Sequence, residues 1–204
     1  MLYKQSVREH TLELLKKIML VPELFPFGLA GGTALALQIG HRLSVDLDFF
    51  GKKEFSASEL VDLLYSFGKI QLLSQNKNIV VMQIDNIKVD FVNYRYPLIK
   101  KQINRENIRL YALPDLVAMK LAAIAGRGRK RDFIDIFFLF EYYNLSEMMS
   151  FYNHKYSDGS ELMVARSLTY FDDAEQDEEP VLIKKAKWSE IKEKIKQEVR
   201  NEYI

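Results

Sequence analysis

The stretch that decides the fold runs from Phe27 to Gly51 and reads FGLAGGTALALQIGHRLSVDLDFFG. The glycine pair Gly31-Gly32 interrupts an apolar run, and a helix-like segment from Thr33 to Ile39 follows it. The next segment, Ser44 to Phe50, alternates apolar and acidic residues, and alternation at period two is typical of a β-strand. The stretch therefore predicts a glycine turn, a helix and then an acidic strand.

Two carboxylates are predicted to share one face of that strand. The alternation puts Asp46 and Asp48 on this face, about 7 Å apart along the backbone, and places Val45, Leu47 and Phe49 on the other. Ionised carboxylates at this separation repel each other unless water or a cation lies between them. The pair therefore predicts either a magnesium site completed by substrate phosphates or a solvated strand face.

The glycine pair predicts a place for a phosphate. A turn without Cβ atoms lets a phosphate approach the backbone closely. If Thr33 begins a helix, the free N–H groups and the positive end of the helix dipole point towards an anion. The glycine turn and the acidic strand together indicate a nucleoside triphosphate held by both.

Composition narrows the class of protein. With 204 residues the chain is expected to form one domain, or one domain with an appendage, and a 48% hydrophobic content is ample for a packed core. A net charge of +1 predicts no general attraction to nucleic acid, so that any RNA contact needs a local basic patch. The absence of cysteine excludes disulfides and thiolate metal sites, and the three histidines show no zinc spacing. The N-terminus has no signal-peptide core and no segment reads as a membrane span, which predicts a soluble cytoplasmic protein.

Periodicity and turn signals predict an α+β fold. Helices are expected at residues 6–20, 33–39, 56–67, 115–125, 132–143, 145–152, 161–171 and 188–203. Ser56 and Glu59 predict a capping box at the start of the third of these, and the acidic residues 172–179 are expected to form a solvated loop. Strands are expected at residues 25–30, 44–50, 70–73, 79–84, 87–92 and 108–112. The pattern changes to helices after residue 112, so residues 1–112 are expected to form a mixed sheet flanked by helices and residues 113–204 a helical C-terminal lobe.

A third acid lies on a later strand. The predicted strand at residues 87–92 alternates again and puts Asp90 on its polar face, where it meets the first two acids if the strands pair. The alternative is a polar outer face exposed to water.

The helical lobe offers candidate cations. Lys120 lies on an apolar helix, where a lysine either extends to solvent or reaches a triphosphate. The segment Gly126 to Arg131 reads GRGRKR, which is either a solvated loop or a contact for RNA phosphates. Asp132 is placed to cap the helix that follows, and Asp135 lies one turn further on, where both could position Lys120.

The order of these motifs resembles the DNA polymerase β nucleotidyltransferase superfamily. The longer match is GGTALAL, then Gly40-His41-Arg42 with Ser44, Asp46 and Asp48, then Lys120 through Arg131-Asp132 and Asp135, which resembles the AbiEii/AbiGii toxin family. The resemblance covers about residues 27–140. It implies a nucleotidyltransferase-type fold and an enzyme that moves a nucleotide from an NTP to an RNA 3′ end, with tRNA as the expected acceptor and a cognate antitoxin as partner.

The resemblance also implies roles for single residues. Asp46, Asp48 and Asp90 would be catalytic and would hold Mg²⁺. The nucleotide would contact a second group: Gly31, Gly32, Thr33, Arg42, Ser44, Lys120, Arg131, Asp132 and Asp135. One departure matters, because many superfamily members have Gly-Ser where this chain has Gly31-Gly32-Thr33. Here Thr33 or bare backbone must serve the phosphate.

Two other functions fit the same residues. One is a nucleotidyltransferase of the same fold that modifies a small molecule, as antibiotic-modifying enzymes do. The other is a nucleotide-binding or partner-binding module that has lost catalysis. An intact carboxylate set argues against the second, and a basic groove for RNA would distinguish the RNA enzyme from the first.

Overall fold

The computed structural model describes residues 1–203 of the protein. The chain forms two compact units, the first made of Met1–Tyr96 and Lys101–Tyr111, the second of Pro97–Lys100 and the residues from Ala112 onwards. The four residues Pro97–Lys100 therefore belong to the second unit, although the residues on both sides of them belong to the first. Among the described residues, no helix has both the length and the apolar character that a membrane span requires.

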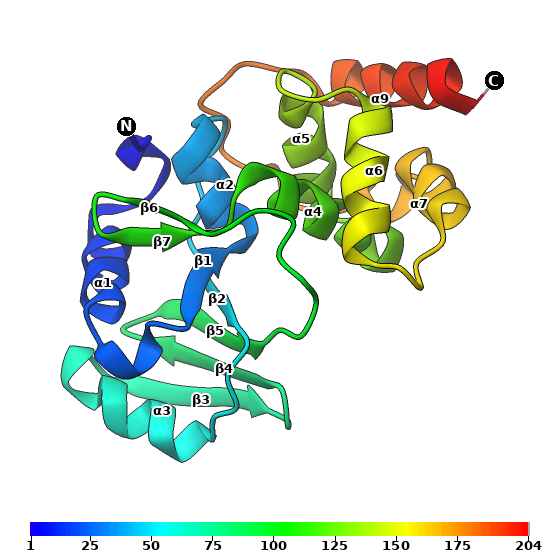
Figure 1. Ribbon diagram of the computed structural model, residues 1–204. Coiled ribbons are helices and arrows are strands. Elements are labelled where there is room, and N and C mark those ends of the chain that lie inside the picture. The colour runs from blue at the N-terminus through cyan, green and yellow to red at the C-terminus, as the bar shows by residue number, and fades with distance from the viewer. Residues whose placement is uncertain (204) are drawn as a thin grey trace. The chain divides into compact units, whose positions relative to one another are not determined.

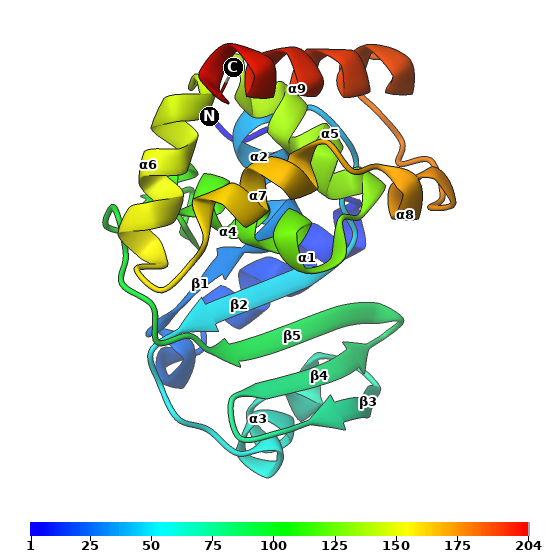
Figure 2. The same cartoon turned by 90° about the vertical axis from the view of Figure 1, so that its right-hand side faces the viewer.

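The first unit is built on a seven-stranded mixed sheet (Figure 1). The strands lie in the spatial order β3-β4-β5-β2-β1-β7-β6. Their bounds are β1 (Phe27–Ala30), β2 (Leu47–Gly51), β3 (Ile70–Gln75), β4 (Ile79–Ile84), β5 (Ile87–Asn93), β6 (Ile103–Arg105) and β7 (Ile108–Leu110). Figure 2 shows β2 and β5 side by side with their arrowheads pointing the same way, because this central pair is parallel.

Turn chemistry explains the antiparallel parts of the sheet. Asp85 and Asn86 have φ values of 45° and 66° between β4 and β5, as a two-residue hairpin turn requires. Glu106 and Asn107 make the same kind of turn between β6 and β7, with φ values of 54° and 63°. The sequence analysis missed β6 because its residues lack an apolar alternation.

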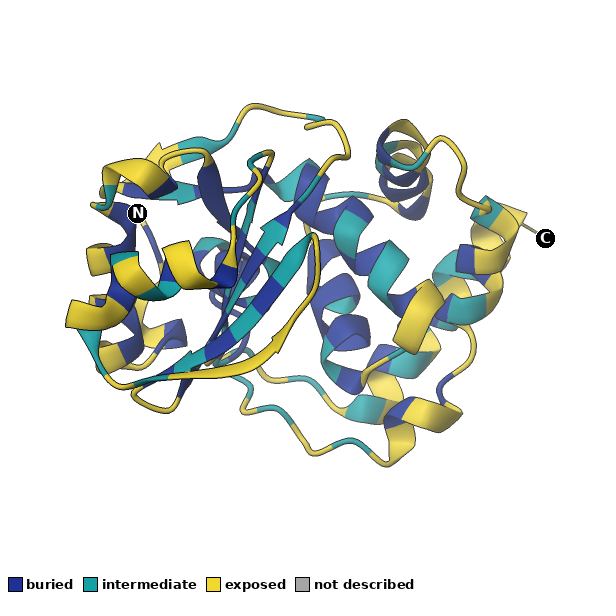
Figure 3. Cartoon of the chain, turned by 90° about the horizontal axis from the view of Figure 1, so that it is seen from below, coloured by how far each residue is buried: buried dark blue, intermediate teal, exposed yellow. Residues whose placement is uncertain are grey.

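The two faces of the sheet differ in chemistry. Leu29, Phe49 and Phe91 are cross-strand neighbours and are buried together on one face. The strands carry alternating buried and partly exposed residues (Figure 3). The pleat therefore places Asp48 and Asp90 on the opposite face.

Helices flank the sheet of the first unit. They are η1 (Lys4–Ser6), α1 (Glu9–Met19), η2 (Pro22–Leu24), α2 (Gly31–Ile39), α3 (Ala57–Leu64) and η3 (Tyr65–Phe67). The predicted capping box of α3 is confirmed, because the Glu59 N–H donates to Ser56 Oγ at 3.2 Å and the Ser56 N–H donates to Glu59 Oε2 at 2.7 Å. Gly40 ends α2 in the left-handed conformation, with a φ of 66°.

The second unit is helical. Its helices are α4 (Leu113–Arg127), α5 (Lys130–Leu139), α6 (Leu145–Lys155), α7 (Glu161–Leu168), α8 (Asp172–Glu175) and α9 (Trp188–Tyr203). Phe133, Phe171 and Trp188 pack their rings together, with centroids 4.8 to 6.1 Å apart. The aromatic residues of α5 thus form core, as sheltered rings at helical spacing usually do.

Several element bounds differ from the sequence-based predictions, and three of these differences change how a segment is interpreted. β2 begins at Leu47 rather than at residue 44, and Val45 is 46% exposed instead of sharing the buried face. The basic segment at residues 126–131 is mostly helical, because α4 continues to Arg127 and α5 begins at Lys130. The acidic segment after residue 171, predicted as a loop, contains the short helix α8.

Candidate active site

The glycine turn brings the backbone against a carboxylate. β1 ends at Ala30, and Gly31 begins α2 with a φ of 64°, in the left-handed region that favours glycine. A Cβ at Gly31 would lie 2.0 Å from Asp48 Oδ2, and a Cβ at Gly32 would lie 2.5 Å from Arg42 Nη2. Glycine is therefore required at position 31, where both the φ and the carboxylate oppose a Cβ, whereas at Gly32 the Arg42 guanidinium would have to move to make room for one.

Asp48 and Asp90 are direct neighbours on the central strand pair. Their Cα atoms are register partners in the parallel β2–β5 ladder, and Asp48 is also the register partner of Ala30 in β1. Adjacent strands lie about 4.8 Å apart, so the two carboxylates meet on the same face beside the glycine turn. The predicted encounter of acids distant in the sequence is present for these two.

One carboxylate oxygen of Asp90 is paired with a lysine, and the other can still bind a cation or a hydrogen-bond donor. Lys88 Nζ donates to Asp90 Oδ2 at 2.5 Å from the same strand face. Asp90 Oδ1 is buried, with no hydrogen-bond partner among residues 1–203. A buried acceptor without a partner costs free energy, and a bound cation or donor would remove that cost.

Asp46 lies differently from its prediction. It precedes β2 and therefore does not continue the strand face of Asp48. Its main-chain oxygen accepts a hydrogen bond from the Thr33 hydroxyl. Thr33 is fully buried, and its Oγ1 also lies 2.8 Å from Ser44 Oγ, so these contacts fix the loop before β2 against the start of α2.

Arg42 supplies positive charge next to the glycine turn. Its side chain is 4% exposed, Nη1 donates to the main-chain oxygen of Leu43 at 3.0 Å, and Nη2 is the nearest atom to the Cβ position at Gly32. The first unit thus gathers most of the predicted residues in one place: Gly31, Gly32, Thr33, Arg42, Ser44, Asp46, Asp48 and Asp90.

The remaining predicted residues lie in the second unit, where Lys120 is the centre of a buried ion-pair network. Its Nζ lies 2.7 Å from Asp132 Oδ1 and 2.6 Å from Asp135 Oδ2, and the two carboxylates are fully buried. Arg127 Nε lies 3.3 Å from Asp132 Oδ2. Asp132 is the third residue of α5 and pairs with Lys120, so its predicted capping role is wrong, while the predicted network around Lys120 is present.

The rest of the basic segment is engaged within the second unit. The Lys130 N–H donates to Asp177 Oδ2 at 2.8 Å, and Lys130 Nζ donates to Glu179 Oε1 at 2.9 Å. Lys130 is only 3% exposed, and Arg131 is partly buried within α5. The acidic segment that was expected to be solvated therefore meets a cation of its own chain.

A second buried ion pair was missed by the sequence analysis. Lys155 Nζ lies 2.7 Å from Asp115 Oδ1 and donates to the main-chain oxygen of Pro97 at 2.8 Å. Asp115 also accepts from the N–H groups of Ile99 and Lys100, at 2.9 and 3.0 Å. Burial lowers the pKa of Lys155, and the Asp115 carboxylate opposes that shift. This pair fastens residues 97 to 100 to the second unit.

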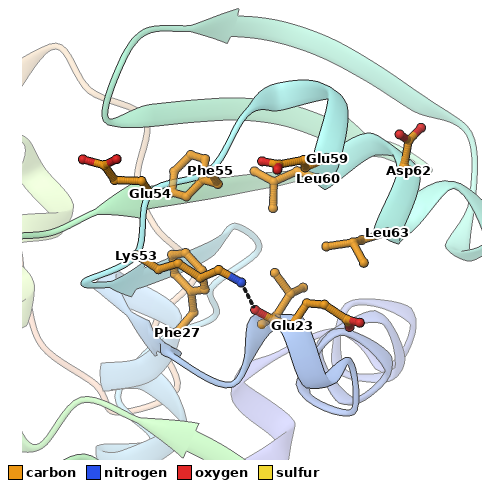
Figure 4. Close-up of a pocket in the computed structure, with 10 residues that line it drawn as sticks. Glu23, Phe27, Lys53, Glu54, Phe55, Glu59, Leu60, Asp62 and Leu63 are labelled. Carbon is orange, nitrogen blue, oxygen red and sulfur yellow. Dashed lines mark hydrogen bonds between the residues drawn. The ribbon is translucent and has the colours of Figure 1, made fainter.

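A hollow of about 330 Å³ lies between α3 and the segment from Glu23 to Phe27 (Figure 4). Phe27 lines it, and Phe27 shares the pleat face of Leu29 rather than that of the carboxylates. In Figure 4 the Lys53 ammonium donates to the main-chain oxygen of Glu23, a distance of 2.6 Å. This hollow is therefore separate from the candidate site.

The carboxylates of the candidate site fit the predicted Mg²⁺ as a pair rather than as a set of three. Among residues 1–203, no group of three or more histidine, cysteine, aspartate or glutamate side chains is arranged to hold a metal ion, so Asp46, Asp48 and Asp90 do not form a ready three-ligand cage. Asp48, Asp90 and the unpaired Asp90 Oδ1 still fit Mg²⁺, which is usually held by one or two carboxylates together with substrate phosphates.

Comparison with known proteins places these features in a family. The profile of the family described as "Nucleotidyl transferase AbiEii toxin, Type IV TA system" matches residues 13–203. An uncharacterized protein from Aquifex aeolicus (strain VF5) is 33% identical over 213 residues, which cover 98% of this chain and 98% of that protein.

Two solved structures share the fold. A candidate nucleotidyltransferase from H. pylori matches with a TM-score of 0.59 and 20% identity, over 95% of each chain. The nucleotidyltransferase toxin MenT4 from Mycobacterium tuberculosis H37Rv matches with a TM-score of 0.55 and 14% identity, over 95% of this chain and 86% of its own. These likenesses confirm the predicted α+β fold of nucleotidyltransferase type.

Proposed function

The chain belongs to the AbiEii family of nucleotidyltransferase toxins, and from that premise we propose that it transfers a nucleotide from an NTP to the 3′ end of an RNA, with tRNA as the acceptor and Mg²⁺ as the metal. Family membership also implies an antitoxin as the cellular counterpart of the protein. The observation that carries the proposal is the register of Asp48 with Asp90 beside Gly31.

The carboxylates are proposed to bind the metal and to deprotonate the hydroxyl of the RNA acceptor. Asp48 and Asp90, with Asp46 close by in the sequence, would hold Mg²⁺, and the metal would lower the barrier by neutralising charge on the phosphates and favouring ionisation of the attacking hydroxyl. Asp90 is proposed to accept the proton of that hydroxyl, and the acceptor capacity left on its Oδ1 supports this role. Lys88 balances the charge of Asp90 from the same strand.

The glycine turn supports binding of the NTP phosphates. The first N–H groups of α2 have no helical partner, and the positive end of the helix dipole lies at Gly31. Arg42 adds a guanidinium beside Gly32. The Thr33 hydroxyl is engaged with Asp46 and Ser44, so backbone N–H groups, rather than this hydroxyl, are proposed to contact the phosphates.

The test is a labelled-nucleotide assay. The purified protein is incubated with each of the four α-labelled NTPs, Mg²⁺ and total tRNA, and labelled RNA is separated from free nucleotide. We expect label in RNA, and we expect Asp48→Asn and Asp90→Asn to reduce the initial rate by about 100-fold or more, because metal-assisted charge stabilisation is worth several kcal/mol. Asp62→Asn is the matched control, since Asp62 is exposed and lines the hollow between α3 and the segment from Glu23 to Phe27.

Three outcomes would contradict the proposal. Full activity of Asp48→Asn would remove the carboxylate pair from the mechanism. Transfer of label to a small-molecule acceptor in a cell extract, with none in RNA, would favour the small-molecule enzyme. Nucleotide binding without any transfer would indicate a non-catalytic module.

A further inference from the structure

Four aromatic rings form a cluster on the carboxylate face of the sheet. The rings of Phe50 and Tyr94 have centroids 5.0 Å apart, and those of Tyr94 and Tyr96 are 5.3 Å apart. Tyr111 contacts Phe50 and Tyr94 at 6.3 and 6.5 Å. None of these residues was a candidate in the sequence analysis, because three separate segments contribute them.

The strand register places this cluster next to the carboxylates. Phe50 follows Asp48 by two residues on β2 and therefore projects from the same face, about 7 Å further along the strand. Tyr94 directly follows β5, four residues after Asp90, and its ring contact with Phe50 places it beside that residue. Its N–H donates to the main-chain oxygen of Gly51 at 2.8 Å, which continues the parallel pairing. The rings therefore lie next to the carboxylates, further along β2 and β5.

Exposure rises along the cluster. Tyr111 is 3% exposed and anchors the rings in the unit, whereas Tyr96 is 46% exposed. A ring that is held at its edge by a second ring and open to solvent is suited to stack against a flat aromatic group. Nucleobases are such groups, and their stacking on aromatic side chains is worth about 1–3 kcal/mol per base.

Cations lie beyond the rings. A hollow of about 290 Å³ at the ends of β2 and β5 is lined by Lys52, Lys53, Glu54, Asn93 and Arg95. Arg95 Nη2 lies 3.5 Å from Glu54 Oε1, and both side chains are mostly exposed, so a phosphate can replace this pairing at little cost. Lys52 is exposed as well. Because the Lys53 ammonium donates to the main-chain oxygen of Glu23, the cations left to this hollow are Lys52 and Arg95, which outnumber the one carboxylate of Glu54.

We propose that the rings of Phe50, Tyr94 and Tyr96 are the stacking platform for the unpaired terminal base of the RNA acceptor, and that Lys52 and Arg95 contact the phosphates of that RNA. The inference rests on the proposed function. It assigns the platform to the acceptor rather than to the NTP because the cations lie on the far side of the rings from Gly31. An NTP whose phosphates bind at the glycine turn has no phosphate left for them, whereas a polynucleotide does.

Tyr96 provides the decisive variant. Tyr96→Ala is expected to weaken binding of a fluorescent single-stranded RNA oligonucleotide by about fivefold or more, and to raise KM for RNA while leaving KM for the NTP unchanged. Tyr96→Phe keeps the ring and should behave as the wild type. Tyr65→Ala is the matched control, because Tyr65 is 73% exposed in η3 of the same unit.

Lys52 tests the phosphate contacts independently. Lys52→Ala should lower the slope of log Kd against log salt concentration by about 0.7, the value for one phosphate contact to a single strand. Lys77→Ala in the exposed turn between β3 and β4 should leave the slope unchanged. Equal slopes for the two variants would overturn the assignment of Lys52.

The outcomes separate this inference from the proposed function, because oligonucleotide binding is measured by fluorescence anisotropy without NTP. If the wild type labels RNA but Tyr96→Ala binds RNA as tightly as the wild type, the platform is refuted and the function stands. If Tyr96→Ala raises KM for the NTP instead, the platform serves the incoming base and our assignment is wrong. If the wild type neither labels nor binds RNA, both proposals fail.

Discussion

Replacement of Gly31 by alanine tests the arrangement on which the candidate site depends. Two independent penalties apply to this substitution. The φ of 64° is unfavourable for an L-residue by about 1–2 kcal/mol. The new Cβ would also lie 2.0 Å from Asp48 Oδ2, and overpacking of this kind typically costs about 1–3 kcal/mol. We therefore expect Gly31→Ala to reduce the free energy of unfolding of the first unit by about 2–5 kcal/mol.

The structure also predicts how much of this loss a second substitution relieves. Asp48→Ala removes both Oδ2 and Cγ, and the nearest remaining atom of that residue is Cβ, at 3.1 Å from the Gly31 Cβ position. Most of the overlap then disappears, while the backbone penalty of about 1–2 kcal/mol remains. The double-mutant cycle should accordingly give a favourable coupling energy of about 1–3 kcal/mol, within the range known for contacting residues.

The free energy of unfolding of the first unit alone is measured by hydrogen–deuterium exchange in urea. Mass spectrometry follows the exchange of peptides from β1, β2 and β5. Gly126→Ala is the matched control, because no atom lies within 4 Å of its Cβ position in helix α4. This control should stabilise the second unit by about 0.5–1 kcal/mol, as glycine-to-alanine changes in helices do. A coupling energy near zero, or a Gly31→Ala variant as stable as the wild type, would refute the close approach of Gly31 to Asp48.

Two further predictions concern the second unit. Lys120→Met removes the ammonium that the buried carboxylates of Asp132 and Asp135 share, although Arg127 Nε remains 3.3 Å from Asp132. The loss should cost about 3–5 kcal/mol in urea unfolding followed by the fluorescence of the single tryptophan. Adding the two Asp→Asn changes should recover much of this loss, and no recovery would show that Lys120 acts elsewhere. The Tyr203 hydroxyl donates to Glu161 Oε1 at 2.6 Å, and this bond, together with one from Asn153, lowers the pKa of Glu161 from its ordinary value. A carboxylate with a lowered pKa stabilises the fold above its unfolded pKa, and this contribution is lost as the pH falls through the folded pKa. The destabilisation caused by Tyr203→Phe should therefore be present at neutral pH and vanish in acid, as exchange rates of α9 amides can show, whereas a pH-independent difference would contradict this account.

Features set by local chemistry were predictable from the sequence. The capping box of Ser56 and Glu59 and the left-handed end of α2 at Gly40 depend on residues within one turn of each other. The alternation of apolar and polar residues along β5 is likewise local, and it suffices to predict that Asp90 lies on the polar face of the strand. The fold of the first unit followed from these elements and from the resemblance to a known family.

Features set by tertiary contacts were not predictable in this way. The alternation of residues 44–50 continued through Val45 and Asp46, but the hydrogen bond from Thr33 to the Asp46 oxygen holds this segment outside β2. The charge run around Lys130 looked solvated, and only the folded chain brings Asp177 to it.

The parallel pairing of β2 with β5 has a consequence for the protein during its synthesis. Asp48 and Asp90 are joined by a ladder between segments that are far apart in the chain, and such long-range pairing forms late because a large loop must close first. A nascent chain that ends before β5 contains Asp48 but not Asp90. The carboxylate pair of the candidate site can therefore form only after translation has passed β5 and the ladder has closed.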